Sequence, residues 1–176
     1  MTGPAATLRA ASYWVETMLV APGIVAHELA HVAACRLTGV AVHGGPVLNP
    51  FGRDAYVEHE RVDSFPADLA IAVAPLVLNT ALAAVSLALA FRVSSLVVAA
   101  PLFWVGGSTA LTAFPSVGDT ETLYDTAGDL PWPVQPLAYL LAVPVRTFTA
   151  LPGSAGVAGF LWLVVLLAWA RPAVPA

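Results

Sequence analysis

The sequence predicts an all-α integral membrane bundle of about four transmembrane helices, organised as a single membrane domain over residues 1–176. Hydrophobic residues make up 59% of the chain and charged residues only 10%, against about 45–50% and about 25% in soluble domains. The mean hydropathy is +0.80. Four apolar stretches approach or exceed the roughly 20 residues that a helix needs to cross a bilayer.

The composition also excludes several classes of protein. Its apolar content excludes an intrinsically disordered chain. The 7 basic residues are outnumbered by 11 acidic ones, for a net charge of −4, which excludes a nucleic-acid-binding protein. The single cysteine, Cys35, cannot form an internal disulfide or a paired-cysteine metal site. Glu16 interrupts the apolar N-terminal run, and no small-residue cleavage site follows, so we expect no cleaved signal peptide.

The first predicted span covers residues 13–37 and carries ionisable side chains. A proline–glycine pair lies within it and is expected to bend the helix. The pair is followed by His27, Glu28 and His31. Ionisable groups inside a membrane are costly and indicate function by default, so this span holds the first candidate site.

A polar segment, residues 38–67, separates the first two spans. Residues 40–43 and 47–48 have extended character, and a Gly-Gly-Pro turn divides them. Residues 55–62 could pair back as a second strand. We therefore expect a short β-like loop directly after the first helix.

The other predicted spans cover residues 69–91, 93–114 and 154–170. Arg92 and about one residue on each side separate the first two of these, which predicts a tight helical hairpin. Residues 120–133 are polar and contain acidic but no basic side chains. Residues 134–151 are apolar but contain two prolines and an arginine, which favours a re-entrant or interfacial helix over a short fifth span.

The segment His27-Glu28-Leu29-Ala30-His31 forms an HExxH motif. On a helix the two histidines lie one turn apart on the same face, where they can bind one zinc ion, and the glutamate can act as general base toward a water. An accidental match is expected roughly 0.003 times in a chain of this length and composition. The alternative is a pair of buried histidines satisfied by neighbouring helices, with Glu28 paired to one of them. Inside a membrane span, metal binding is favoured.

A catalytic zinc site takes three protein ligands and leaves one position open. The candidates for the third ligand are Asp119, His43, His59, Asp54, Asp68 and Cys35. Topology favours Asp119: His27 lies ten residues before the end of the first span, about 15 Å below the membrane face, and two crossings return the chain to that face. Asp119 could instead cap a helix that begins at Thr120. The two loop histidines are more simply solvated, and the cysteine is expected to pack.

Asn79 is the strongly polar residue of the second span and lies about 15 Å from the same face. It could donate a hydrogen bond to a substrate backbone or oxyanion. It could equally join neighbouring helices. Both alternatives remain open.

These features resemble the site-2 protease family of intramembrane zinc metalloproteases, and especially a divergent branch of small prokaryotic zincin membrane peptidases. The HExxH lies inside an apolar helix, and the segment that ends in Gly39-Val40-Ala41-Val42 is similar to the family's G-V-x-V run. A polar, partly β loop follows. Pro75 and Asn79 on the next span are similar to the family's G-P-x-x-N segment, and Asp119 follows the helix after which the family places its third ligand.

The chain departs from the family pattern at two places. Ala74 stands where the family has a glycine, and the spacing from proline to asparagine is four rather than three. The family's N-P-D-G is absent, and Phe114-Pro115-Ser116-Val117-Gly118-Asp119 stands in its place.

The resemblance implies an intramembrane zinc endopeptidase that hydrolyses peptide bonds in or near transmembrane segments of membrane proteins. His27, His31 and Asp119 would bind Zn²⁺, Glu28 would be the general base toward a zinc-activated water, and Asn79 would contact the substrate. The implied partners are a transmembrane protein substrate and membrane lipid, with no nucleic acid, for a multi-pass protein of a prokaryotic cell membrane. Two alternatives are a catalytically silent zinc-binding scaffold or regulator and a small ion transporter; the latter would more naturally carry internal repeats.

Overall fold

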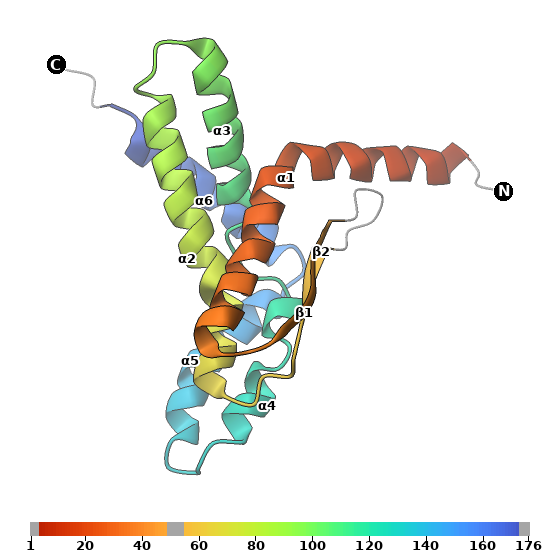
Figure 1. Cartoon of the computed structure of the whole chain (residues 1–176), viewed down its shortest axis with the longest axis vertical. Coiled ribbons are helices and arrows are strands. Elements are labelled where there is room, and N and C mark those ends of the chain that lie inside the picture. The colour runs from red at the N-terminus through yellow and green to blue at the C-terminus, as the bar shows by residue number, and fades with distance from the viewer. Residues whose placement is uncertain (1–3, 49–54, 173–176) are drawn as a thin grey trace.

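The computed structural model describes residues 4–48 and 55–172, and this part of the chain is mostly helical. Long helices run along the longest axis, with a two-stranded ribbon at one side (Figure 1). In chain order the elements are α1 (Pro4–Thr38), β1 (Val42–Leu48), β2 (Ala55–His59), α2 (Phe65–Ala90), α3 (Leu96–Leu111), the 3₁₀ helix η1 (Gly118–Thr120), α4 (Leu123–Gly128), α5 (Gln135–Ala150) and α6 (Ser154–Ala170). The predicted helical architecture is confirmed, and so is the short β segment after the first helix.

α1 is bent, and its N-terminal part projects away from the other helices (Figure 1). Pro22 lies inside α1. It has no N–H to donate to the carbonyl four residues earlier, and its ring crowds that carbonyl, which bends a helix. The part of α1 after the bend carries the HExxH motif. The predicted bend and the helical placement of the motif are therefore both found.

The ribbon consists of β1 and β2, which pair antiparallel with Val42 opposite His59. The register is irregular between Val42 and Val47. The Gly-Gly-Pro segment that was expected to turn the chain is thus absorbed into one irregular strand, because bulges let a strand continue past residues that do not pair regularly. β2 ends at His59, earlier than the predicted strand over residues 55–62.

Small residues allow α2, α3 and α6, which lie side by side in the upper half of Figure 1, to approach closely. A Cβ at Gly106 of α3 would lie 2.7 Å from Cγ of Leu87 of α2, and a Cβ at Gly159 of α6 would collide with the backbone carbonyl of Leu111. Leu87 is buried with Ala83, Ala110 and Leu166. Close approach through glycine is typical of helices that pack within membranes.

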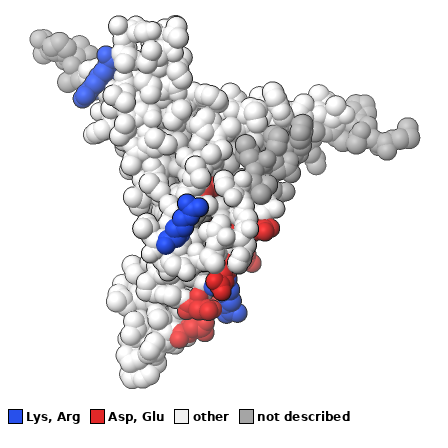
Figure 2. Space-filling view, viewed as in Figure 1, with Lys and Arg blue, Asp and Glu red and all other residues white. Residues whose placement is uncertain are grey.

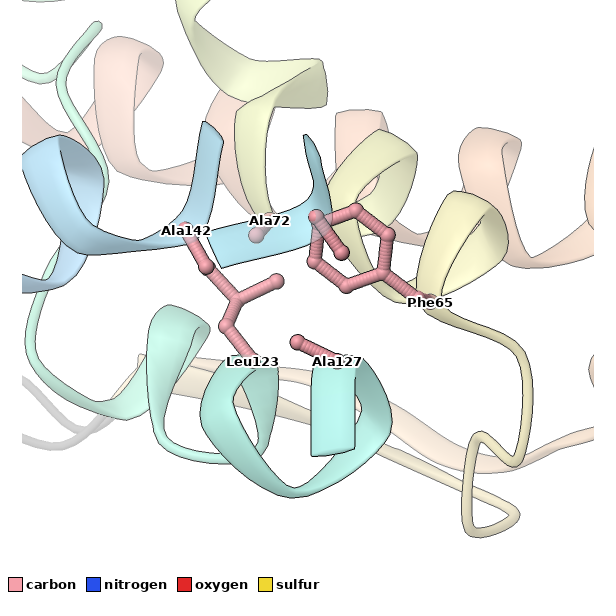
Figure 3. Close-up of a cluster of buried hydrophobic side chains, with 6 residues drawn as sticks. Phe65, Ala72, Leu123, Ala127 and Ala142 are labelled. Atoms are coloured by element: carbon pink, nitrogen blue, oxygen red, sulfur yellow. The ribbon is translucent and has the colours of Figure 1, made fainter. Parts of the chain in front are cut away.

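A second buried cluster joins the start of α2 to α4 and α5. Figure 3 shows Phe65 and Ala72 of α2 beside Leu123 and Ala127 of α4 and Ala142 of α5. This cluster fixes α4 against α2. The segment that links α3 to α4, which contains η1, is thereby anchored at its C-terminal end.

Within the described residues, two helices are long and apolar enough to cross a membrane, namely Ala11–Thr38 of α1 and α2. α5 and α6 together would make a third candidate span, bent by 98° at their junction. This content is consistent with a membrane protein. On the face shown in Figure 2, acidic side chains gather near the strands and α4, whereas the surface over α2 and α3 is almost free of them.

The four predicted spans are not confirmed. α3 has 16 residues, fewer than the 93–114 segment expected to be helical, because Ser95 is still extended and Thr112 has already left the helix. Residues 91–95 connect α2 to α3, so the hairpin is less tight than predicted. The 154–170 segment is helical as α6, but it follows the sharp bend from α5. The 134–151 segment is largely helix α5, and its interfacial or re-entrant placement stays a prediction.

Candidate metal centre

His27, His31 and Asp119 lie together, and one potential ligand atom from each falls within 4.8 Å of the others. α1 supplies both histidines from successive turns, and η1 supplies the aspartate after the end of α3. Both histidines are buried, and the Asp119 side chain is only 17% exposed. These three residues could hold a metal ion, as the sequence predicts.

The carboxylate of Asp119 faces both imidazoles. Its Oδ2 lies 3.3 Å from Nε2 of His27, and its Oδ1 lies 3.2 Å from Nε2 of His31. The backbone N–H of Ser116 donates to Oδ2 at 2.6 Å, which fixes the carboxylate within the turn after α3. Burial by itself would raise the pKa of the Asp119 carboxyl. Imidazoles that carry a hydrogen on Nε2 donate to this carboxylate and outweigh burial, so that in the metal-free site the pKa of Asp119 lies well below its usual range.

Backbone carbonyls orient both histidine rings. Nδ1 of His27 lies 2.6 Å from the carbonyl oxygen of Thr112, and Nδ1 of His31 lies 3.0 Å from that of Ile71. A carbonyl oxygen only accepts hydrogen bonds, so each Nδ1 must carry the hydrogen. In a neutral imidazole this leaves the lone pair on Nε2, the nitrogen that faces Asp119. Such a backbone partner is the usual outer support of a metal-binding histidine.

This donor set fits a metal cation. When both imidazoles are neutral, two Nε2 lone pairs and a carboxylate face one another, and these acceptors repel unless a cation lies between them. Nε2 of His31 is buried and, although Oδ1 of Asp119 lies 3.2 Å away, it makes no well-aligned hydrogen bond among the described residues, which is costly unless a ligand satisfies it. Many catalytic zinc sites use two imidazole nitrogens and one carboxylate oxygen as protein ligands and leave the fourth position open.

Glu28 lies beside the three ligands at the wall of a cleft of about 310 Å³. The cleft is also lined by residues of β2, of the start of α2 and of the η1 region: His31, Tyr56, Val57, His59, Asp68, Ile71, Ser116, Gly118, Asp119, Glu121 and Thr122. Glu28 is itself buried. A carboxylate that lines the same cleft as the ligands is placed to exchange a proton with a molecule that enters.

Asn79 is fully buried where α1, α2 and α3 meet. Its Nδ2 donates toward the carbonyl of Gly23 at 3.1 Å, and toward the carbonyl and hydroxyl oxygens of Thr112 at 3.2 and 3.1 Å. Its amide hydrogens are thus engaged between helices, as in the second alternative considered for it. Substrate contact by Asn79 remains a prediction. The Thr112 carbonyl also accepts a hydrogen bond from His27, so Thr112 links Asn79 to the ligand cluster.

The other candidate ligands lie elsewhere or are otherwise engaged. His43 and His59 are exposed, although His59 lines the cleft. Cys35 is buried in an apolar cluster with Ala34, Val62 and Ile71, as its expected packing role requires. Asp54 lies outside the described residues. Asp68 is buried and accepts hydrogen bonds from the hydroxyls of Thr122 at 2.9 Å and Thr126 at 2.8 Å.

Sequence reasoning missed the groups that support the ligands. Asp68 ties α2 to Thr122, three residues after Asp119, and so holds the segment that carries the third ligand. The carbonyls of Ile71 and Thr112 orient the histidines. Every residue has a backbone carbonyl, so residue type does not show which carbonyls support a ligand. The sequence can indicate only where helical hydrogen bonding is interrupted and a carbonyl is left free.

Comparison with models of known families, with curated proteins and with solved structures finds no match to this chain.

Proposed function

We propose that this protein is an intramembrane zinc endopeptidase that hydrolyses peptide bonds in or near transmembrane segments of other membrane proteins. The observation that carries the proposal is the convergence of His27, His31 and Asp119, with Glu28 beside them at an open cleft. The motifs that resemble the site-2 protease family support the same proposal, with the chain as a divergent small member.

The chain's own residues then have distinct roles. A zinc ion held by His27, His31 and Asp119 would supply a Lewis acid that polarises the scissile carbonyl and lowers the pKa of a water. Glu28 would serve as the general base that takes a proton from the nucleophilic water and as the acid that returns it to the leaving amine. The carbonyls of Thr112 and Ile71 keep the imidazoles in one orientation throughout.

The substrate would enter in extended form. Peptide bonds in a helix are hidden by their own hydrogen bonds, so a transmembrane segment must unwind before it is cleaved. β2 contributes Tyr56 and Val57 to the cleft wall, and within the described sheet β2 pairs only with β1. An unwound segment could add to the ribbon as a further strand and so present its backbone to Glu28.

The proposal is tested by Glu28→Gln in purified protein reconstituted with a labelled single-pass substrate. Gln is nearly isosteric and leaves both imidazoles in place, so zinc content should equal that of the wild type. Cleavage should fall about 10²–10⁴-fold, since a general base has been removed. Glu60→Gln is the matched control, because Glu60 is exposed and outside the cleft lining, and it should cleave like the wild type.

Other outcomes separate the remaining functions. Zinc bound at one ion per chain with no cleavage by the wild type would indicate a silent zinc-binding scaffold or regulator. Ion flux that falls in Glu28→Gln, without any cleaved product, would indicate a transporter. Cleavage by Glu28→Gln at the wild-type rate would refute the role of Glu28 and with it the peptidase proposal.

A further inference from the structure

The carbonyl oxygen of Ile71 lies in the interior of α2, where backbone carbonyls are normally occupied. In an α-helix the carbonyl of residue i accepts the N–H of residue i+4. Residue 75 is a proline inside α2, and proline has no N–H. The Ile71 carbonyl therefore lacks its helical donor, and Nδ1 of His31 lies 3.0 Å from it.

The other ligand histidine, His27, also faces a carbonyl without a helical donor. Thr112 directly follows α3, and the N–H four residues later belongs to Ser116. That N–H donates to Oδ2 of Asp119 instead. The Thr112 carbonyl is left to accept from two side chains, His27 and Asn79. Each ligand histidine thus faces a carbonyl that has no helical N–H partner, because of Pro75 in one case and because of the end of α3 in the other.

We propose that Pro75 is a positioning residue of the metal centre, and that what it contributes is the absence of an N–H group. By leaving the Ile71 carbonyl free, Pro75 allows His31 to hold its hydrogen on Nδ1 and to direct its Nε2 lone pair at the ligand position beside Asp119. Pro75 is fully buried in α2 and acts through Ile71. This inference rests on the metal centre proposed above.

The competing explanation is that Pro75 only shapes or packs α2. The two explanations differ for Pro75→Ala, which restores an N–H opposite the Ile71 carbonyl. Alanine is a far better helix former than proline, so a purely structural role predicts a helix at least as stable and an unchanged metal site. A positioning role predicts that the new N–H competes with His31 for the carbonyl, and that zinc affinity falls about 10–100-fold, as for loss of other outer supports of metal ligands.

The experiment measures zinc dissociation constants by chelator competition in detergent, together with the ¹⁵N NMR signals of the histidine rings in the metal-free protein. Pro101→Ala is the matched control, since Pro101 is also inside an apolar helix but is exposed; its zinc affinity should be that of the wild type. In the wild type His31 should be protonated at Nδ1, and in Pro75→Ala this tautomer should lose population. Pro75→Val, which restores the N–H and keeps more of the buried volume, replaces Pro75→Ala if the latter does not fold.

The outcomes separate failure of the proposed function from failure of the role of Pro75. A wild type that binds no zinc refutes the proposed function, and the NMR arm still decides the role of Pro75. Zinc affinity of Pro75→Ala within twofold of the wild type, or an unchanged His31 tautomer in the metal-free variant, overturns the positioning role. A selective loss of affinity in the residue-75 variants, with Pro101→Ala unaffected, supports it.

Discussion

Gly23 lies where α1 passes closest to the end of α3, one helical turn before His27. A Cβ at this position would collide with the backbone carbonyl of Ser108 and lie 2.5 Å from Oγ1 of Thr112. Ordinary contact begins at 3.4 Å, so Gly23→Ala would need α1 and the Thr112 region to separate by at least about 0.9 Å, and the Ser108 carbonyl, which lies closer still, demands more. Gly23 and His27 share one face of α1 because they are four residues apart.

The same displacement acts on the first ligand. His27 Nδ1 lies 2.6 Å from the Thr112 carbonyl, and a separation of about 0.9 Å would bring it to about 3.5 Å, beyond the hydrogen-bonding range. We therefore expect Gly23→Ala to weaken zinc binding about 10–100-fold, as for other losses of a ligand's hydrogen-bond support. Overpacking at the helix contact should also lower the free energy of unfolding by about 1–3 kcal/mol.

Gly107→Ala is the matched control, since a Cβ at Gly107 meets no atom within 4 Å. It should leave zinc affinity unchanged and stabilise α3 by up to about 1 kcal/mol through helix propensity. The assay is chelator competition for zinc combined with chemical unfolding in the same detergent. Equal zinc affinities for Gly23→Ala and Gly107→Ala would refute the argument that the approach of α1 to α3 sets the position of His27.

Two further predictions address topology and packing. In a background without the native cysteine, single cysteines placed at Tyr56 and at Asp125 should react with an impermeant reagent from the same side of the membrane. A cysteine placed at Arg92 should react from the other side, because α2 leads away from the site and α3 leads back. Labelling of positions 56 and 125 from opposite sides would contradict this topology. Leu87→Ala should lower the free energy of unfolding by about 2–5 kcal/mol, since removal of a buried leucine side chain leaves a cavity. Leu89 is 46% exposed, so Leu89→Ala should lower the free energy of unfolding clearly less. Equal losses in chemical unfolding would contradict the assignment of Leu87 to the buried core.

The parts of the site that depend on local sequence could be predicted, and those that depend on helix ends could not. The HExxH histidines share a face wherever a helix forms, so their pairing follows from spacing alone. Asp119 could be placed by counting crossings, because the argument needs only the order of elements. The length of α3 could not be predicted from apolar content, since the extended Ser95 determines where that helix begins. The bounds of α6, 154–170, were predicted, but the sharp bend before it, at the left-handed Gly153 with φ of 77°, was not.

The supports of the ligands were beyond sequence reasoning for a different reason. Thr112 and Ile71 act through backbone carbonyls, which every residue possesses. The sequence marks Asn79 as a polar residue that either contacts substrate or joins helices, but its hydrogen bond to Thr112 depends on how α2 and α3 cross. The interior proline of α2 is visible in the sequence, yet its consequence for His31 becomes apparent only when α1 is seen to pack beside it.

If His27, His31 and Asp119 form one metal centre, the purified protein should carry metal, and its metal content can be measured directly. Elemental analysis of the wild type, prepared without added metal or chelator, should find about one zinc per chain, as expected for a site with three protein ligands. Asp119→Ala should retain clearly less zinc, because a charged ligand has been removed while both imidazoles remain. A wild type with no bound transition metal, or an Asp119→Ala variant with the full zinc content of the wild type, would contradict the account.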